Sequence, residues 1–179
     1  SERFSMDIAT AFANSDYITG GSSVSKVSGL TDTQVRANFS VGSDLLVFTV
    51  GLNLPTGQYS IADDQVAAAG QIGNDFLGYP ISSMGNGFAG TGGVAFARAL
   101  GSWNLGVGAS MRKSAEFSAF NLDTADFRFS PADEYRLRLG LDRPVGNGQV
   151  ALGVSFSAFG EDLANGTTYS TGDRITATG

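Results

Sequence analysis

Hydrophobic and polar residues alternate with a period of two in most segments of this chain. In residues 46–54, leucine, phenylalanine and valine fill the even positions, and valine, threonine, glycine and asparagine fill the odd ones. Such alternation is typical of a β-strand with one apolar face. Because the opposite face stays rich in Gly, Ser and Arg, which a packed soluble core would not tolerate, the pattern predicts strands with lipid on one side and water on the other.

The alternation predicts about eight strands. We expect them over residues 4–18, 35–41, 45–54, 90–100, 103–112, 135–142, 150–157 and, more weakly, 169–178. Short turns are expected near Ser43, Gly101 and Gly146, and long loops over 19–33, 56–88, 118–132 and 160–168. In the segment 90–100, Val94, Phe96 and Arg98 alternate with alanines, so the sequence does not assign its two faces.

Connections that are alternately long and short are typical of bacterial outer-membrane barrels, which have brief periplasmic turns and extended outer loops. The predicted fold is therefore an all-β, antiparallel, up-and-down transmembrane β-barrel over residues 1–179, in the outer membrane of a Gram-negative bacterium and in contact with membrane lipid. Phe4 and Trp103 near the turns, and Tyr17 and Tyr135 near the loops, fit aromatic girdles. A soluble secreted β-sandwich is the alternative, in which the face of residues 46–54 packs on a second sheet.

Composition narrows the functional classes. The net charge of -6 argues against a nucleic-acid partner, which requires a basic surface. The chain has no cysteine, which removes disulfides and thiolate metal sites, and no histidine, which removes histidine-dependent hydrolysis. We expect no enzyme activity, no cofactor and no metal. The G-x-G-x-x-G match at residues 85–90 precedes an expected strand rather than a helix, so it does not predict a nucleotide site.

Charged residues on the small-residue face are the candidates for a pore lining. Arg112 lies on one expected strand, and Arg136 and Arg138 lie on the next. The full candidate set is Arg36, Asn38, Arg112, Arg136, Arg138 and Asp142. Two interpretations remain open. Either the arginines attract anionic solutes, or they are neutralised by Asp142, Asp7 or Glu116.

The long loop 56–88 is the candidate for a lid or constriction. Its apolar content is unusual for a solvated connection and predicts a short helix folded over or into the pore. Packing on a neighbouring strand is an equally good interpretation. The candidate residues are Asp63, Asp64, Val66, Ile72, Phe76 and Leu77.

The segment 51–57, with the sequence Gly-Leu-Asn-Leu-Pro-Thr-Gly, ends a strand and enters this loop. It resembles outer-membrane channel proteins of the phenol-degradation MetA-pathway type and, more loosely, long-chain fatty acid transporters. The resemblance implies passive uptake of small, apolar or aromatic compounds. In contrast to such barrels, the sequence shows no final strand that ends in an aromatic residue. We therefore expect part of a larger barrel, since eight strands leave little interior space and the inward residues are small.

The predicted function is that of a porin-like channel or transporter for passive diffusion of small solutes. A second hypothesis is a non-transport barrel that contacts another outer-membrane protein, or a second copy of itself, through its acidic loops.

Overall fold

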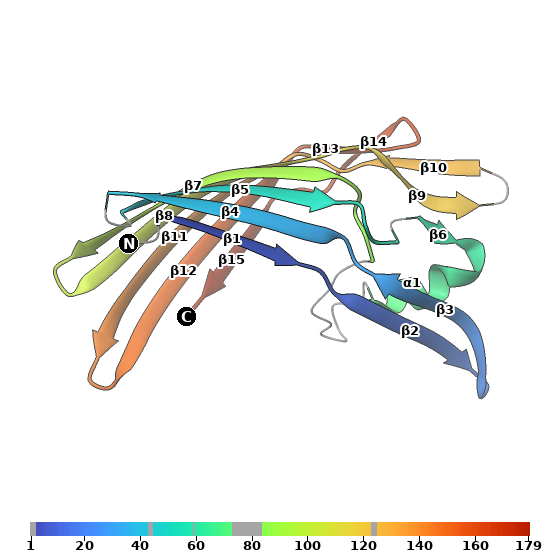
Figure 1. Cartoon of the computed structure of the whole chain (residues 1–179), viewed down its shortest axis with the longest axis horizontal. Coiled ribbons are helices and arrows are strands. Elements are labelled where there is room, and N and C mark those ends of the chain that lie inside the picture. The colour runs from blue at the N-terminus through green and yellow to red at the C-terminus, as the bar shows by residue number, and fades with distance from the viewer. Residues whose placement is uncertain (1–2, 43–44, 59, 73–83, 123–124) are drawn as a thin grey trace.

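The computed structural model describes residues 3–42, 45–58, 60–72, 84–122 and 125–179. Eight of its strands form one antiparallel sheet, here called the main sheet, in the order β1-β4-β5-β7-β8-β11-β12-β15 (Figure 1). They are β1 (Phe4–Ala9), β4 (Thr33–Val41), β5 (Leu46–Leu54), β7 (Ala89–Leu100), β8 (Trp103–Ser114), β11 (Glu134–Val145), β12 (Gly148–Phe159) and β15 (Arg174–Thr178). The eight strands have the same order in the sheet as along the chain, and each is antiparallel to its neighbours. This confirms the predicted all-β, antiparallel, up-and-down arrangement.

Three short connections lie at one end of the main sheet, here called the turn end (left in Figure 1). Gly42, Gly101 and Gly146 lie in these connections with φ of 67°, 65° and 58°. Glycine adopts this left-handed conformation at no steric cost, which allows the tight turns that join antiparallel strands. The turns predicted near Gly101 and Gly146 are therefore confirmed in position. Ser43 lies outside the described residues, but the Leu45 amide on one side of it donates to the Gly42 carbonyl on the other.

The opposite end, here called the loop end, contains more strands than we predicted. They are β2 (Phe12–Thr19), β3 (Ser22–Leu30), β6 (Ile61–Ala62), β9 (Phe117–Leu122), β10 (Ala125–Ser130), β13 (Glu161–Ala164) and β14 (Thr167–Ser170). β2 pairs with β3, and the others form a sheet in the order β14-β13-β10-β9-β6. The predictions that 19–33, 118–132 and 160–168 are loops and that one strand spans 169–178 are therefore wrong.

The predicted strand over residues 4–18 is interrupted between β1 and β2. Thr10 Oγ1 donates to the carbonyl of Thr31 over 3.1 Å, and the Ala11 amide donates to Thr31 Oγ1 over 3.0 Å. Thr31 thus takes over the hydrogen bonds that a continuous strand would make at this point. The β2–β3 hairpin consequently leaves the main sheet and forms a separate ladder.

The apolar side chains of the main sheet lie together on one face, here called the apolar face. They remain open: Ile8 is 63 % exposed, Val50 62 % and Leu137 57 %. No second layer of the described residues covers them, so the β-sandwich alternative is wrong. The register pairs Phe96 of β7 with Val107 and Arg98 with Leu105, which assigns Val94, Phe96 and Arg98 to the apolar face.

The main sheet has two edges, β1 and β15. Among the described residues, no pairing joins these two strands. The structure therefore shows a curved, open antiparallel sheet (Figure 1), and closure into a barrel remains a prediction. Within the same ranges, no helix has the length and apolar character needed to cross a membrane.

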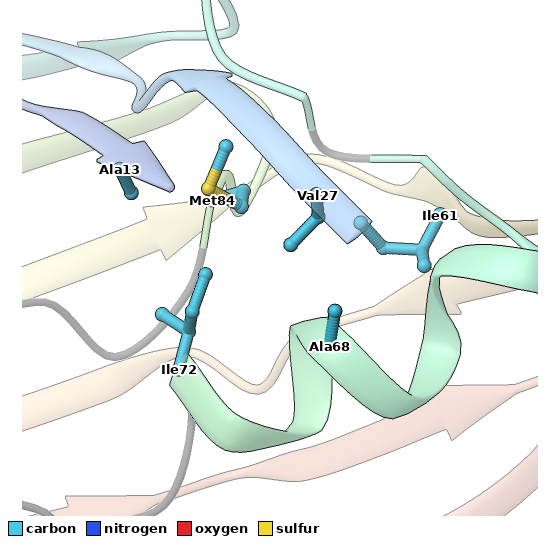
Figure 2. Close-up of a cluster of buried hydrophobic side chains, with 6 residues drawn as sticks. All are labelled: Ala13, Val27, Ile61, Ala68, Ile72 and Met84. Atoms are coloured by element: carbon cyan, nitrogen blue, oxygen red, sulfur yellow. The ribbon is translucent and has the colours of Figure 1, made fainter. Parts of the chain in front are cut away.

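A small buried core lies at the loop end. The 3-10 helix η1 (Asp63–Gln65) and the helix α1 (Val66–Ile72) pack against the β2–β3 hairpin. Figure 2 shows the side chains that meet there, with Val27 of β3 between Ile61 of β6 and Met84. Val27 is 1 % exposed and Ala68 of α1 is 0 % exposed. This cluster holds the first part of the loop 56–88 against the hairpin.

Candidate functional site

The second side of the main sheet, here called the polar face, carries the predicted pore-lining residues and is hollowed. A cavity of about 380 Å³ lies over β1, β4, β5, β7, β8 and β11. One row of register partners crosses it from Asp7 and Arg36 through Thr91 to Arg112 and Glu134. The alternation of each strand places these side chains on the same side of the sheet.

Two of the arginines on this face are paired with carboxylates. Arg36 Nε donates to Asp7 Oδ2 over 3.1 Å. Arg136 Nη2 donates to Glu134 Oε1, and its Nε donates to Ser157 Oγ over 3.0 Å. Asp7 and Glu134 thus each have an arginine as their ion-pair partner.

The acidic partners proposed from the sequence are engaged elsewhere. Glu116 pairs with Arg128 of β10 over 3.4 Å. Asp142 accepts hydrogen bonds from Asn104 over 3.0 Å and from Gln149 over 2.9 Å. The interpretation in which Asp142, Asp7 or Glu116 neutralises Arg112, Arg136 and Arg138 is therefore wrong for these residues, because Arg136 turns to Glu134 instead.

Three arginines of the polar face have no hydrogen bond or salt bridge within the described part of the chain: Arg112, Arg138 and Arg174. Arg112 is the register partner of Glu134, but that carboxylate faces Arg136. Arg138 and Arg174 line a hollow of about 670 Å³ across β7, β8, β11, β12 and β15. Arg112 lines the cavity of about 380 Å³ instead. Unpaired cations therefore face both hollows and favour a positive potential there.

Arg174 was absent from the prediction because β15 is short and its alternation is weak. The register shows its place: Arg174 lies opposite Ser157 of β12, and Ser157 lies opposite Arg136 of β11. The available signal was the alternation of Arg174, Thr176 and Thr178 with Ile175 and Ala177, once residues 174–178 are taken as a strand.

Asn38, the remaining predicted polar residue, also lies on this face. Its Nδ2 donates to Ser5 Oγ over 3.3 Å, and its Oδ1 accepts from Thr49 Oγ1 over 2.8 Å. Asn38 thus ties β1, β4 and β5 together.

The predicted lid begins as a helix that is bonded to the β2–β3 hairpin. Ser25 Oγ donates to the carbonyl of Asp64 over 2.6 Å and accepts from the Ala68 amide over 3.1 Å. Ile72 is buried, whereas Val66 is 43 % exposed. The interpretation of packing on a neighbouring strand is therefore correct for Ile72. Asp63 lies in η1, and Phe76 and Leu77 lie outside the described residues.

A buried carboxylate at the loop end was not foreseen. Asp32, 7 % exposed, accepts from Asn53 Nδ2 over 2.8 Å, from the Asn86 amide over 2.7 Å and from the Gly57 amide over 3.1 Å. These donors belong to β5 and to the two ends of the loop 56–88. Asp32 therefore fixes both ends of that loop to the start of β4.

Comparison with known proteins bears on the fold. No protein-family model and no curated protein matches the chain. The crystal structure of the COG4313 outer membrane channel from Pseudomonas putida F1 is similar, with a TM-score of 0.65 and 19 % sequence identity, over 99 % of this chain and 64 % of that one. The chain has the fold of an outer-membrane channel. It spans about 64 % of that channel's length.

Proposed function

We propose that this chain forms the wall of a channel in a bacterial outer membrane, through which small solutes diffuse passively. The observation that carries the proposal is the contrast between the two faces of the main sheet. One face exposes rows of leucine, valine and phenylalanine, and the other is hollow and carries unpaired arginines. Lipid is the matching solvent for the apolar face, and water is the matching solvent for the polar face.

The orientation follows from the two ends of the sheet. Outer-membrane barrels carry short turns at the periplasmic side and long connections outside. We therefore assign the turn end, with Gly101 and Gly146, to the periplasm and the loop end to the cell exterior. The similarity in fold to an outer membrane channel supports the choice of membrane, and the lengths of the connections carry the orientation.

We further propose that the sheet closes into a barrel by pairing of β1 and β15 with additional strands. Eight strands alone would enclose an interior just wide enough to be filled by side chains. The polar face instead carries small residues at many inward positions, such as Gly106, Gly140 and Gly153, which form one register row. A larger barrel uses this space as a water-filled passage.

The solute class follows from the polar face and from the motif at residues 51–57. Arg112, Arg138 and Arg174 attract anions, and a guanidinium both binds a carboxylate and stacks on an aromatic ring. The likeness of the motif to MetA-pathway channels favours small apolar or aromatic compounds. Small aromatic acids combine the two properties. The proposal assigns no catalytic activity to the chain.

Reversal of the lumenal charges tests this proposal in planar bilayers. We expect the protein to conduct chloride in preference to potassium, and Arg112→Glu/Arg138→Glu/Arg174→Glu to invert that preference. The control is Arg98→Gln, which removes a cation from the apolar face and should leave the selectivity unchanged. Conductance with the same selectivity in the triple variant would contradict the arginine lining. Absence of conductance with ordered loops bound to another protein would favour the interaction hypothesis.

A further inference from the structure

Two arginines lie on the apolar face of the main sheet, close to the turn end. Arg98 of β7 is the register partner of Leu105, and Arg143 of β11 is the register partner of Val150. Neither has a hydrogen bond or a salt bridge within the described part of the chain. Charged side chains on the lipid side of a barrel are destabilising by about 2–4 kcal/mol at the bilayer midplane but by about 0–1 kcal/mol near its surfaces. Two arginines are therefore expected at a surface of the bilayer rather than in its centre.

Trp103 of β8 lies beside Arg143 on one side and, on the other, opposite β7 at a position two residues from Arg98. Its ring lies 5.2 Å from the Arg143 guanidinium carbon, and Leu100 of β7 is its register partner. Arg143 Nε is the buried side-chain atom without a hydrogen-bond partner in the described residues. The guanidinium thus lies over the ring, and its terminal nitrogens, which have no hydrogen-bond partner among the described residues, can bind an acceptor outside the protein.

The depth of this site follows from strand β8. Trp103 and Lys113 lie on the apolar face at the two ends of this strand, and the apolar-face positions between them are Leu105, Val107, Ala109 and Met111. At about 3.4 Å per residue and a tilt of roughly 40°, the two ends are about 26 Å apart along the membrane normal, close to the roughly 25 Å apolar band of such barrels. Lys113 pairs with Asp133 over 3.5 Å at the loop end. Trp103 and Arg143 therefore lie at the opposite boundary of the band.

Arg98 lies two residue pairs further into the band than Trp103, opposite Leu105. A long arginine side chain reaches a membrane surface from such a position while its methylene groups stay on apolar surface. The neighbouring acidic residue, Asp142, faces the polar side and is bonded to Asn104 and Gln149. No carboxylate among the described residues thus competes with an external anion at this site.

We propose that Arg98, Trp103 and Arg143 bind the phosphate group of an anionic phospholipid in the leaflet that meets the turn end. The partner is identified by complementarity: two uncompensated cations and an amphipathic aromatic ring at the boundary of an apolar surface fit a negatively charged headgroup with acyl chains beside it. The inference rests on the proposed function, since it requires that the apolar face meets lipid.

Trp103 is the one tryptophan of the chain and therefore reports directly on its lipid neighbours. The protein is reconstituted in phosphatidylcholine vesicles that contain a fixed fraction of either brominated phosphatidylglycerol or brominated phosphatidylcholine. We expect brominated phosphatidylglycerol to quench Trp103 more strongly in the wild type. In Arg98→Gln/Arg143→Gln, the preference for phosphatidylglycerol is expected to fall about 30-fold, as about one kcal/mol for each basic residue implies.

Matched variants distinguish this site from a general charge effect. Arg138→Gln/Arg174→Gln removes the same charge from the polar face and should retain the preference. Arg98→Lys/Arg143→Lys keeps both cations, should retain the preference, and replaces the glutamine variant if that variant does not fold. Equal quenching by the two lipids in the wild type would overturn the inference. Loss of the preference on addition of inorganic phosphate would overturn it as well, because the site would then bind a soluble anion.

The same measurement separates failure of the inference from failure of the proposed function. If neither brominated lipid quenches Trp103, the apolar face does not meet lipid and the channel proposal falls with the lipid site. If both quench equally, the apolar face does meet lipid and only the headgroup site is overturned.

Discussion

The main sheet and the loop end place their apolar side chains in opposite ways. In the main sheet, Val50 and Leu137 are more than half exposed, and arginines lie on the other face. At the loop end, Val27 and Ala68 are enclosed, and a buried carboxylate connects three segments. The sheet depends on two different solvents outside the protein, whereas the loop end has a core of its own. Lipid should therefore stabilise the sheet, and internal contacts should stabilise the loop end.

The largest effect is expected from Asp32→Ala, which should destabilise the loop end but not the main sheet. The amides of Gly57 and Asn86 lose the carboxylate acceptor, and Asn53 Nδ2 keeps only the Gly87 carbonyl. A buried hydrogen bond lost in this way is destabilising by about 1–3 kcal/mol. Hydrogen exchange should show faster opening of β2 and β3 with unchanged protection in β8 and β11. The exposed Asp7→Ala is the control. Equal loss of protection in both regions would contradict the separation of the two.

The next effect concerns the two faces of the main sheet. Leu139→Arg places a charge in the middle of the apolar face and should lower the free energy of unfolding in vesicles by about 2–4 kcal/mol. Ser155→Arg adds the same side chain on the polar face, at the register partner of Arg138, and should be tolerated. Urea unfolding followed by Trp103 fluorescence measures both. Similar losses in the two variants would argue against different solvents on the two faces.

Alanine substitutions at two glycines of the loop 56–88 should have smaller effects on stability, and the two effects should be opposite in sign. A Cβ on Gly57 would lie 2.3 Å from the Met84 carbonyl oxygen and 2.6 Å from the Asp32 amide nitrogen, so Gly57→Ala should destabilise the loop end by about 1–3 kcal/mol. A Cβ on Gly70, within α1, meets no atom within 4 Å, so Gly70→Ala should stabilise the helix by about 0.5–1 kcal/mol. Protection of the amides in α1 reports both changes, and a loss in Gly70→Ala would contradict the described packing.

The smallest effect is a pH dependence at the tip of the β2–β3 hairpin, outside the main sheet. The Ser23 hydroxyl, 2.5 Å away, and the Lys26 ammonium, 3.0 Å away, lower the pKa of Asp16 below its ordinary value of 3.8. A lowered pKa in the folded state stabilises the hairpin above that ordinary value, and this contribution is lost as pH falls through the lowered one. Amide exchange of β2 measured across this range should show the loss, and Asp16→Asn should abolish it. A pH dependence that persists in Asp16→Asn would assign it to another group.

The strands of the main sheet could be predicted because period-two alternation is local and is set by what each face meets. The loop-end strands could not, since they are short and depend on distant partners: β6 has two residues, and its Ile61 pairs in parallel with Phe120. The face on which each arginine lies could be predicted from its odd or even position in the strand. Its partner could not, because Glu134 turns to Arg136 on its own strand rather than to its register partner Arg112.

Asp32 was missed for a related reason. In the sequence it lies between two threonines within the expected loop 19–33, where a solvated residue is expected. Its burial depends on the approach of residues 53, 57 and 86, which no local pattern encodes. The resemblance drawn from residues 51–57 was informative about the fold, and the structure gives that segment a physical role, since Asn53 and Gly57 both bind Asp32.

The central claim is that lipid covers one face of the main sheet and water the other. The chain has no cysteine, so single cysteines at positions 137 to 140 of β11 can carry a spin label without a background. In reconstituted vesicles, we predict that labels at 137 and 139 are accessible to oxygen dissolved in the bilayer and that labels at 138 and 140 are accessible to a water-soluble nickel complex. Labels that all favour the water-soluble complex, or that show no alternation, would contradict the account.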